Sequence, residues 1–133
     1  MKMLVDTSVW SLALRRDAPP DIPQVQVLTK ALLGEGDIYT TGIVIQELLQ
    51  GFNGASDSEK IASKLSSLAM IVPDLNDHIE AAKLRNLCRR KGVQAGTIDA
   101  LIARLAIRYE LALLTTDKNF QNMVKHVEIR FAT

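Results

Sequence analysis

The segment Met3-Leu4-Val5-Asp6-Thr7-Ser8, near the start of the chain, decides the fold that we predict. Its first residues are apolar, and a short apolar run bounded by polar residues predicts a buried strand over residues 2–6. Thr7 and Ser8 are residues that can cap a helix, so we expect a helix to follow at once. The segment therefore predicts a strand joined directly to a helix, with Asp6 at the carboxyl end of the strand.

The alternation of strands and helices continues along the rest of the chain. Further short apolar runs predict strands at residues 38–40, 70–72, 111–114 and 127–129. Helical spacing is found between them, over residues 24–33, 42–50, 56–68, 74–91, 98–109 and 118–124. This order predicts the α/β class, with a mostly parallel sheet covered by helices on both faces. In such sheets ligands bind outside the carboxyl ends of the strands.

Four carboxylates occur within otherwise hydrophobic sequence. They are Asp6 after the first apolar run, Glu47 in the third predicted helix, Asp99 near the start of a helix, and Asp117 after Leu113-Leu114-Thr115-Thr116. Burying an isolated charge is prohibitively unfavourable, so each must be hydrogen-bonded, paired or bound to a cation. Singly, each can be a cap, a turn residue or a glutamate that reaches solvent. Four together favour a shared cation.

The helix over residues 98–109 places one of these acids on its apolar face. At about 100° per residue, Ile102 and Ala103 fall on the same side as Asp99. Arg104 and Arg108 fall on the opposite side, which we therefore expect to be solvated. Asp99 is thus predicted to point inward from the first turn of its helix, where the helix dipole favours an anion.

The chemistry of these groups indicates which cation to expect. Carboxylate oxygens without accompanying histidines select Mg²⁺ or Mn²⁺, and His78 and His126 lie among polar residues and are expected to be solvated. Such an ion can bridge phosphate oxygens while the surrounding carboxylates orient an attacking water, which is the chemistry of phosphodiester hydrolysis. The hydroxyls of Ser8 and Thr116 can hold a metal-bound water or a carboxylate, although turn and cap chemistry explains them equally well.

Two further polar features have a structural interpretation. Asp74 and Asp77 are spaced as a capping pair for the helix that ends near Lys91. The single Cys88 can form no internal disulfide and is expected to pack as a small hydrophobic residue. Neither feature is a candidate for catalysis.

Length and composition favour one soluble domain over residues 1–133. Of the 133 residues, 47% are hydrophobic, which is enough for a substantial core. No apolar run reaches the roughly 20 residues of a membrane span. Asp6 also interrupts the N-terminus before the apolar region of a signal peptide can form. We therefore expect a cytoplasmic protein with no membrane partner.

The overall charge excludes the strong positive field of an avid, nonspecific nucleic-acid binder. The net charge is +1, from 16 basic and 15 acidic residues. Basic residues nevertheless gather locally, at Arg15-Arg16, Arg85, Arg89, Arg90 and Lys91. These side chains can contact a phosphate backbone, or they can simply be solvated helix ends.

Four segments spread over almost the whole chain resemble, in order, the four motifs of PIN-domain ribonucleases, especially VapC-type toxins of type II toxin–antitoxin systems. The segments are Leu4-Val5-Asp6-Thr7-Ser8-Val9-Trp10, Gln46-Glu47-Leu48-Leu49-Gln50-Gly51, Thr97-Ile98-Asp99-Ala100-Leu101-Ile102-Ala103 and Leu114-Thr115-Thr116-Asp117-Lys118-Asn119-Phe120. The resemblance implies a PIN-like α/β/α sandwich with a central, mostly parallel sheet. It also implies an endoribonuclease that depends on Mg²⁺ or Mn²⁺.

The resemblance further implies roles for individual residues and the identity of the partners. By position, Asp6, Glu47, Asp99 and Asp117 match the catalytic and metal-binding acids of the family, and Thr116 matches its frequent hydroxyl before the last acid. The implied partners are an RNA substrate, a cognate VapB-type antitoxin that occupies the active-site groove, and a second copy of the chain in a homodimer.

Two other classes of protein are weighed against this interpretation. A receiver-like signalling domain also binds Mg²⁺ at strand ends, but it needs an adjacent acidic pair, whereas Asp6 is followed by Thr7-Ser8. A catalytically silent or housekeeping RNA-binding protein of the PIN fold is the second alternative. A silent module is expected to lose one or more of the acids, and this chain keeps all four.

Overall fold

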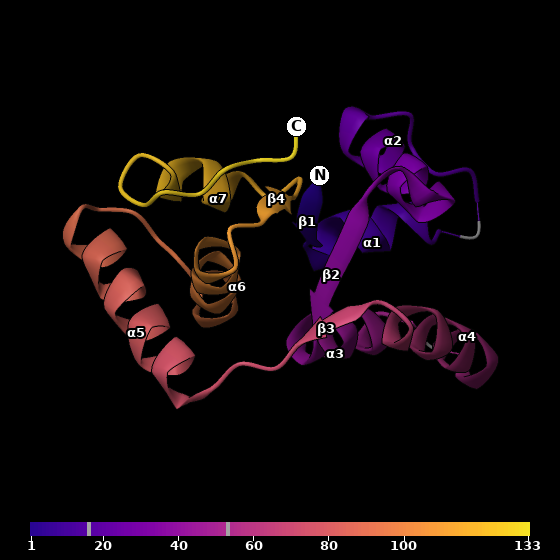
Figure 1. Ribbon diagram of the computed structural model, residues 1–133, viewed down its shortest axis with the longest axis horizontal. Helices are drawn as coiled ribbons and strands as arrows, with labels where there is room; N and C mark the ends of the chain where they lie inside the picture. The colour runs from indigo at the N-terminus through magenta and orange to yellow at the C-terminus, as the bar shows by residue number, and fades with distance from the viewer. Residues whose placement is uncertain (16, 53) are drawn as a thin grey trace.

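The computed structural model describes residues 1–15, 17–52 and 54–133, so Arg16 lies outside the described residues. Four strands form one sheet, β1 (Lys2–Val5), β2 (Asp37–Thr41), β3 (Ala69–Ile71) and β4 (Ala112–Leu114). Their order is β3-β2-β1-β4 and every pairing is parallel. The predicted α/β class with a parallel sheet is confirmed (Figure 1).

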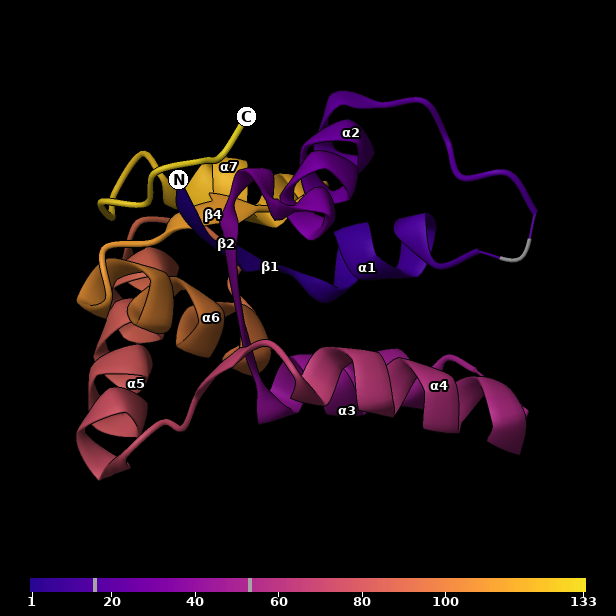
Figure 2. The same ribbon diagram turned by 45° about the vertical axis from the view of Figure 1, so that its right-hand side comes forward.

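Helices cover both sides of this sheet. They are α1 (Thr7–Ala13), α2 (Pro23–Lys30), α3 (Gly42–Gln50), α4 (Ala55–Ser66), α5 (Leu75–Arg90), α6 (Thr97–Arg108) and α7 (Lys118–Met123). Figures 1 and 2 show α1 and α2 on one side of the sheet and α5 and α6 on the other, which is the expected sandwich. The α3 and α4 helices lie side by side beyond the carboxyl end of β2. Within the described ranges, no helix is long and apolar enough to cross a membrane.

The core is built around β1, which is a central strand of the sheet. Met3 pairs in register with Ile38 on one side and with Ala112 on the other. A strand with neighbours on both edges and helices on both faces is apolar throughout, which explains the run that opens the chain. The largest fully buried side chains of the core are Trp10 and Phe120.

The helical segment that includes α2 ends at a glycine, close to the predicted end at residue 33. After Lys30 the chain makes one wider helical turn over Ala31–Glu35. Within it Gly34 has a φ of 96°, in the left-handed region that glycine adopts without steric strain. The backbone is thereby redirected into β2.

The predicted strand at residues 127–129 is wrong. Val127 lies in a turn that follows α7, where its backbone N–H donates to the carbonyl of Met123 over 3.0 Å. Pairing with β4 comes later, as a single bridge between Leu113 and Phe131. The apolar pattern of this segment reflects burial in the core, where Ile129 is only 5% exposed, and not an extended conformation.

The contact between α5 and α6 contains a buried acid that the sequence did not indicate. The predicted capping pair is confirmed, because Asp74 and Asp77 each accept the other's backbone N–H over 2.9 Å. Asp77 is also fully buried and lies 3.2 Å from Nε of Arg104 and 2.6 Å from Nη1 of Arg108. The prediction that both arginines are solvated is wrong for Arg104, whose side chain is 21% exposed.

These partners determine the charge state of Asp77. Burial alone would raise the pKa of its carboxyl group. The backbone N–H of Asp74 and the guanidinium groups of Arg104 and Arg108 outweigh burial and hold the pKa below its usual value. Burial also raises the pKa of the Cys88 thiol, which agrees with its expected role as a small hydrophobic residue of the core.

Candidate active site

The four predicted acids belong to elements that meet at the carboxyl edge of the sheet. Asp6 directly follows β1 and is 7% exposed. Glu47 is on α3, which begins where β2 ends, and Asp117 is the N-cap of α7, shortly after β4. Asp99 is in the first turn of α6. Since β2, β1 and β4 are parallel neighbours, their carboxyl ends share one edge of the sheet.

Two hydroxyl groups hold one oxygen of Asp6. Ser8 Oγ donates to Asp6 Oδ2 over 2.8 Å, and Thr115 Oγ1 donates to the same oxygen over 2.9 Å. The backbone N–H of Asp6 donates to the carbonyl of Leu114 over 2.9 Å. Among the described residues, Oδ1 of Asp6 accepts no hydrogen bond. One carboxylate oxygen is therefore fixed, and the other is available to a ligand.

Thr115 is a site residue that the sequence reasoning missed. The sequence indicated Thr116, whose backbone N–H donates to Ser8 Oγ over 3.1 Å. Within the described part of the chain, the Thr116 hydroxyl has no hydrogen-bond partner, whereas Thr115 Oγ1 also accepts the N–H of Asp117 over 3.0 Å. The strand register explains the difference. Val5 is paired with Leu114, which places the next residue of each strand, Asp6 and Thr115, opposite one another.

Glu47 is held by the first residue of α1. Thr7 Oγ1 donates to Glu47 Oε1 over 3.0 Å, across 40 residues of sequence. The N-cap of α1 is Asp6 and makes no side-chain cap bond, so the prediction that Thr7 and Ser8 cap this helix is wrong. Their hydroxyls bind Glu47 and Asp6 instead. A polar pair at the start of a helix was a sound signal for a helix start, but it did not reveal these distant partners.

The pKa of Asp99 reflects the negative charge at this edge of the sheet. Its pKa is raised to about 6, first by burial and then by the negative charges of Asp117, Asp6 and Glu47. The backbone hydrogen bond from Gly96 acts in the opposite direction and does not compensate. The other three carboxylates are therefore within electrostatic range of Asp99.

The protein supplies little positive charge to neutralise these four acids. In the part of the chain that the structure describes, none of them forms a salt bridge. In the same residues, no three acidic, histidine or cysteine side chains converge closely enough to form a ready-made metal cage. The donors are all oxygens, and the Oδ1 atom of Asp6 is open, so the residues present fit a hard divalent cation such as Mg²⁺, which keeps several water ligands.

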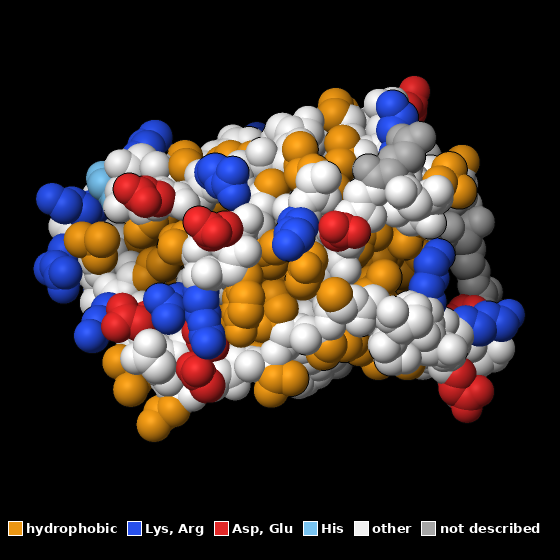
Figure 3. Space-filling model, in the orientation of Figure 1, with side chains coloured by type: hydrophobic (Ala, Val, Ile, Leu, Met, Phe, Trp, Pro, Cys, Tyr) orange, Lys and Arg blue, Asp and Glu red, His pale blue; other side chains and the backbone are white. Residues whose placement is uncertain are grey.

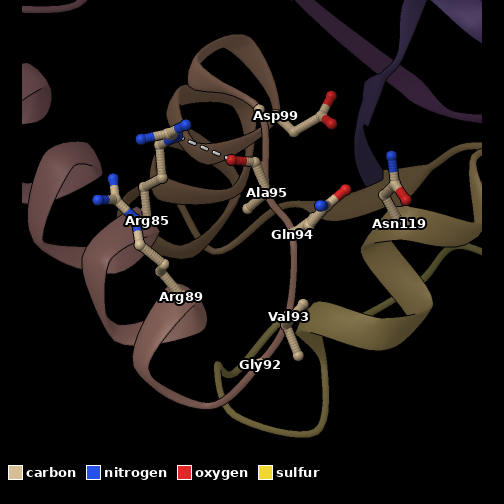
Figure 4. Close-up of a pocket in the computed structure, with 9 residues that line it drawn as sticks. Arg85, Arg89, Gly92, Val93, Gln94, Ala95, Asp99 and Asn119 are labelled. Atoms are coloured by element: carbon tan, nitrogen blue, oxygen red, sulfur yellow. Dashed lines mark hydrogen bonds between the residues drawn. The ribbon is translucent and has the colours of Figure 1, made fainter.

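A cavity of about 630 Å³ opens beside Asp99. Its other walls are Arg85 and Arg89 of α5, the loop over residues 92–96, and Asn119 of α7 (Figure 4). The loop is tied to α5 because Arg85 Nε donates to the carbonyl oxygen of Ala95 over 2.9 Å. Two of the basic residues noted in the sequence therefore border the candidate site.

The parallel sheet and the acids at its carboxyl edge define an α/β protein with an anionic site at the strand ends. The PIN domain family matches residues 3–125, and the chain belongs to this family. A search of curated proteins found no match to the chain.

Solved structures share the same fold. FitAcB from Neisseria gonorrhoeae is 21% identical, and the similarity covers 98% of this chain and 96% of that one with a TM-score of 0.72. VapBC2 from Rickettsia felis, bound to a promoter DNA fragment, is 24% identical and covers 98% and 97% with a TM-score of 0.73. VapC20 from Mycobacterium tuberculosis, a sarcin–ricin loop cleaving toxin, is 16% identical and covers 96% and 98% with a TM-score of 0.72. At these identities the likeness establishes the fold.

Proposed function

We propose that this PIN-domain protein is a metal-dependent endoribonuclease and the toxin component of a VapBC-type toxin–antitoxin system. The observation that carries the proposal is that the fold brings four acids, Asp6, Glu47, Asp99 and Asp117, to the carboxyl edge of the parallel sheet. The pKa of Asp99, raised to about 6 by burial and by the other three carboxylates, supports it. A cluster of negative charge at the ligand-binding edge of a parallel sheet favours a divalent cation and, through it, a phosphate. RNA cleavage by VapC20, which has the same fold, supports RNA as the substrate.

The residues at the edge have distinct parts in the proposed reaction. Asp6, Glu47, Asp99 and Asp117 would hold Mg²⁺ or Mn²⁺. When bound, the ion supplies Lewis acidity to a phosphate oxygen and makes a water molecule more acidic. Ser8 and Thr115 fix the orientation of Asp6, and Thr7 fixes that of Glu47. Asp117 is oriented by the backbone N–H of Asn119, over 2.9 Å. The free hydroxyl of Thr116 would hold a water near the phosphate.

The overall reaction is hydrolysis of one phosphodiester bond. A water oxygen attacks phosphorus, one P–O ester bond breaks, and a proton goes to the leaving oxygen. Catalysis of this kind needs no nucleophile from the protein. Cys88 is buried and does not border the site, in agreement with that role for water.

The same negative charge supports an inhibitory partner. We propose a cognate VapB-type antitoxin that places an arginine or lysine among Asp6, Glu47, Asp99 and Asp117 and competes with the metal there. FitAcB and VapBC2 are complexes with antitoxins, which supports an antitoxin partner for the chain. We also propose that residues 1–133 form one PIN domain that works as a homodimer in the cytoplasm.

The test is RNA cleavage by the purified protein, with Mg²⁺ or Mn²⁺ and with EDTA as the control. Metal-dependent cleavage that is absent in Asp99→Asn is the expected result. No cleavage of any RNA by the wild-type protein with metal would leave the catalytically silent PIN-fold RNA-binding protein as the better account. Co-expression with the product of the adjacent upstream gene tests the partner. If the wild-type chain alone is harmless to its host and no tight complex co-purifies, a housekeeping nuclease becomes preferable.

A further inference from the structure

We propose that a groove between the α5–α6 loop and α7 binds single-stranded RNA beside the scissile phosphate and reads its bases with side-chain amides. This inference rests on the proposed function. The groove consists of two cavities of about 630 and 460 Å³. Both are lined by Gly92, Val93, Gln94 and Asn119, so they are adjacent. We call this surface the amide groove.

The amide groove starts at Asp99 and leads away from it. Asp99 lines the first cavity, and Asn122 and Lys125 line the second. Figure 4 shows Gln94 and Asn119 facing the same space as Asp99. An RNA strand whose phosphate lies at the acids therefore has this groove available for the neighbouring nucleotides on one side of the cut.

Three exposed amides line the amide groove, from Gln94, Asn119 and Asn122. Among the described residues, none of these three side chains has a hydrogen-bond partner within the protein. Each carries two N–H donors and one carbonyl acceptor at a planar end, a set that matches the polar edge of a nucleobase. Free amides in a groove beside an RNA-cleaving site are thus available for base recognition.

The lining also excludes the other common way of binding bases. Among the described residues that line the two cavities, there is no aromatic ring on which a base could stack. The exposed amides remain as the groups that can recognise base edges by hydrogen bonds. The edges that pair in a duplex are free only in unpaired RNA, so the groove is suited to a single strand.

Positive charge accompanies the amides. Arg85 and Arg89 line the first cavity and Lys125 the second, and Asp99 is the one acid among the described lining residues. Figure 3 shows that lysine and arginine side chains gather over the end of the molecule formed by α5 and α7. Such cations bind the phosphates without regard to base sequence.

The wall of the amide groove is fixed before any ligand binds. Besides the bond from Arg85 to Ala95, the backbone N–H of Val93 donates to the carbonyl of Cys88 over 2.8 Å. Gly92 makes this turn with a φ of 76°. A wall that is already ordered loses little conformational freedom on binding, which favours selective recognition.

The first experiment tests the amides by sequencing the cut sites that purified protein makes in a random single-stranded RNA library with Mn²⁺. Gln94→Met removes the amide and keeps the length of the side chain. We expect it to keep cutting but to lose at least roughly fivefold in preference at a base next to the cut. Gln121→Met is the matched control, because Gln121 is exposed on α7 and lines neither cavity. It should reproduce the wild-type cut sites.

The second experiment measures binding of the same library in EDTA, which does not depend on catalysis. We expect Arg89→Ala to bind roughly fivefold more weakly, for all sequences alike and with a shallower salt dependence. The control is Arg90→Ala, which changes a neighbouring exposed arginine that lines neither cavity.

The two experiments separate this inference from the proposed function. If the wild type cleaves RNA but both variants behave like their controls, the amide groove is overturned and the nuclease stands. If the wild type does not cleave, yet Arg89→Ala binds RNA more weakly than Arg90→Ala, the nuclease and base reading beside a cut are overturned, and only RNA binding at the amide groove stands. A wild type that neither cleaves nor binds RNA overturns both.

Discussion

Two acidic regions of the molecule have opposite electrostatic character. At the α5–α6 contact, Asp77 is fully buried, and the backbone N–H of Asp74 together with Arg104 and Arg108 outweighs burial and holds its pKa below the usual value. At the carboxyl edge of the sheet, burial and three other carboxylates raise the pKa of Asp99 to about 6. The fold thus supplies cations to one buried acid and brings further acids to the other.

The charges around a buried acid therefore distinguish a structural acid from a functional one. In a buried ion pair the two charges neutralise each other, and removal of one partner leaves the other charge uncompensated. In a cluster of like charges the carboxylates repel one another, and a bound cation relieves this repulsion.

The largest expected effect is on catalysis. We expect Asp6→Asn and Asp99→Asn to lower RNA cleavage by at least roughly 100-fold, because residues that only support metal ligands already contribute about 10–100-fold. Neither variant should unfold more easily without metal, since the amide keeps the shape of the side chain and removes repulsion. Cleavage rates at saturating Mg²⁺ and thermal unfolding check the two parts. Full activity in either variant would remove that acid from the site.

The second expected effect concerns the paired acid. We expect Asp77→Ala to lower the free energy of unfolding by about 3 kcal/mol, because it leaves Arg104 and Arg108 without their buried partner. Urea unfolding measures this. Asp17→Ala is the control, since its ion pair with Arg15 is exposed and such pairs contribute about 0–1 kcal/mol. A similar small change in both variants would contradict the importance of the buried pair.

The stabilisation of the protein by metal should depend on Asp99 and not on Asp77. We expect Mg²⁺ to raise the thermal midpoint of the wild type through mass action, with a stabilisation of about 2.7 kcal/mol at 100 times the dissociation constant. Mn²⁺ should act at lower concentration because it binds such ligands more tightly. Asp77→Ala should keep the shift and Asp99→Asn should lose most of it. The absence of a shift in the wild type at millimolar metal and pH near 7.5 would contradict the metal site.

The smallest expected effect is a pair of opposite pH dependences in EDTA. For Asp99 the folded pKa, about 6, lies above the unfolded value. The stabilisation that Asp99 gives the folded state is therefore fully present below about pH 3.9 and is lost as the pH rises through 6. The free energy of unfolding should fall by about 1 kcal/mol over this range, after allowing for solvent screening. Asp77 has a lowered pKa, so its contribution is present above about pH 3.9 and is lost as the pH falls through the folded value.

A pH series of urea unfolding compares the wild type with Asp99→Asn and with Asp77→Asn. Relative to Asp99→Asn, the wild type should become less stable between pH 4 and 7. Relative to Asp77→Asn, it should lose stability as the pH falls below about 4. If the difference in the free energy of unfolding between the wild type and the variant changed with pH in the same direction in both comparisons, the contrast between the two acids would be wrong.

The sequence predicted the features that depend on local pattern. The apolar run before Asp6 indicated the central strand, and the alternation of elements indicated the parallel sheet. The spacing of Asp74 and Asp77 indicated a capping pair, which the structure contains. The position of each acid in its element was readable for the same reason, because strand ends and first helical turns are local features.

Features that depend on tertiary register were not predicted. Thr115 reaches Asp6 only because β4 pairs with β1 in one alignment, and no local pattern encodes that alignment. The burial of Asp77 depends on how α5 packs against α6. Residues 127–129 show the converse, because their apolar pattern reflects packing against the core without sheet pairing.

The side-chain bonds around Asp6 also bear on when the site can form during synthesis. Thr115 donates to Asp6 across 109 residues, and Ser8 accepts the N–H of Thr116 across 108. A nascent chain that still lacks β4 therefore has no partner on that side for its first acid, and the loop must close over nearly the whole chain before the site is complete. Almost the entire chain must therefore be synthesised before the candidate active site can form.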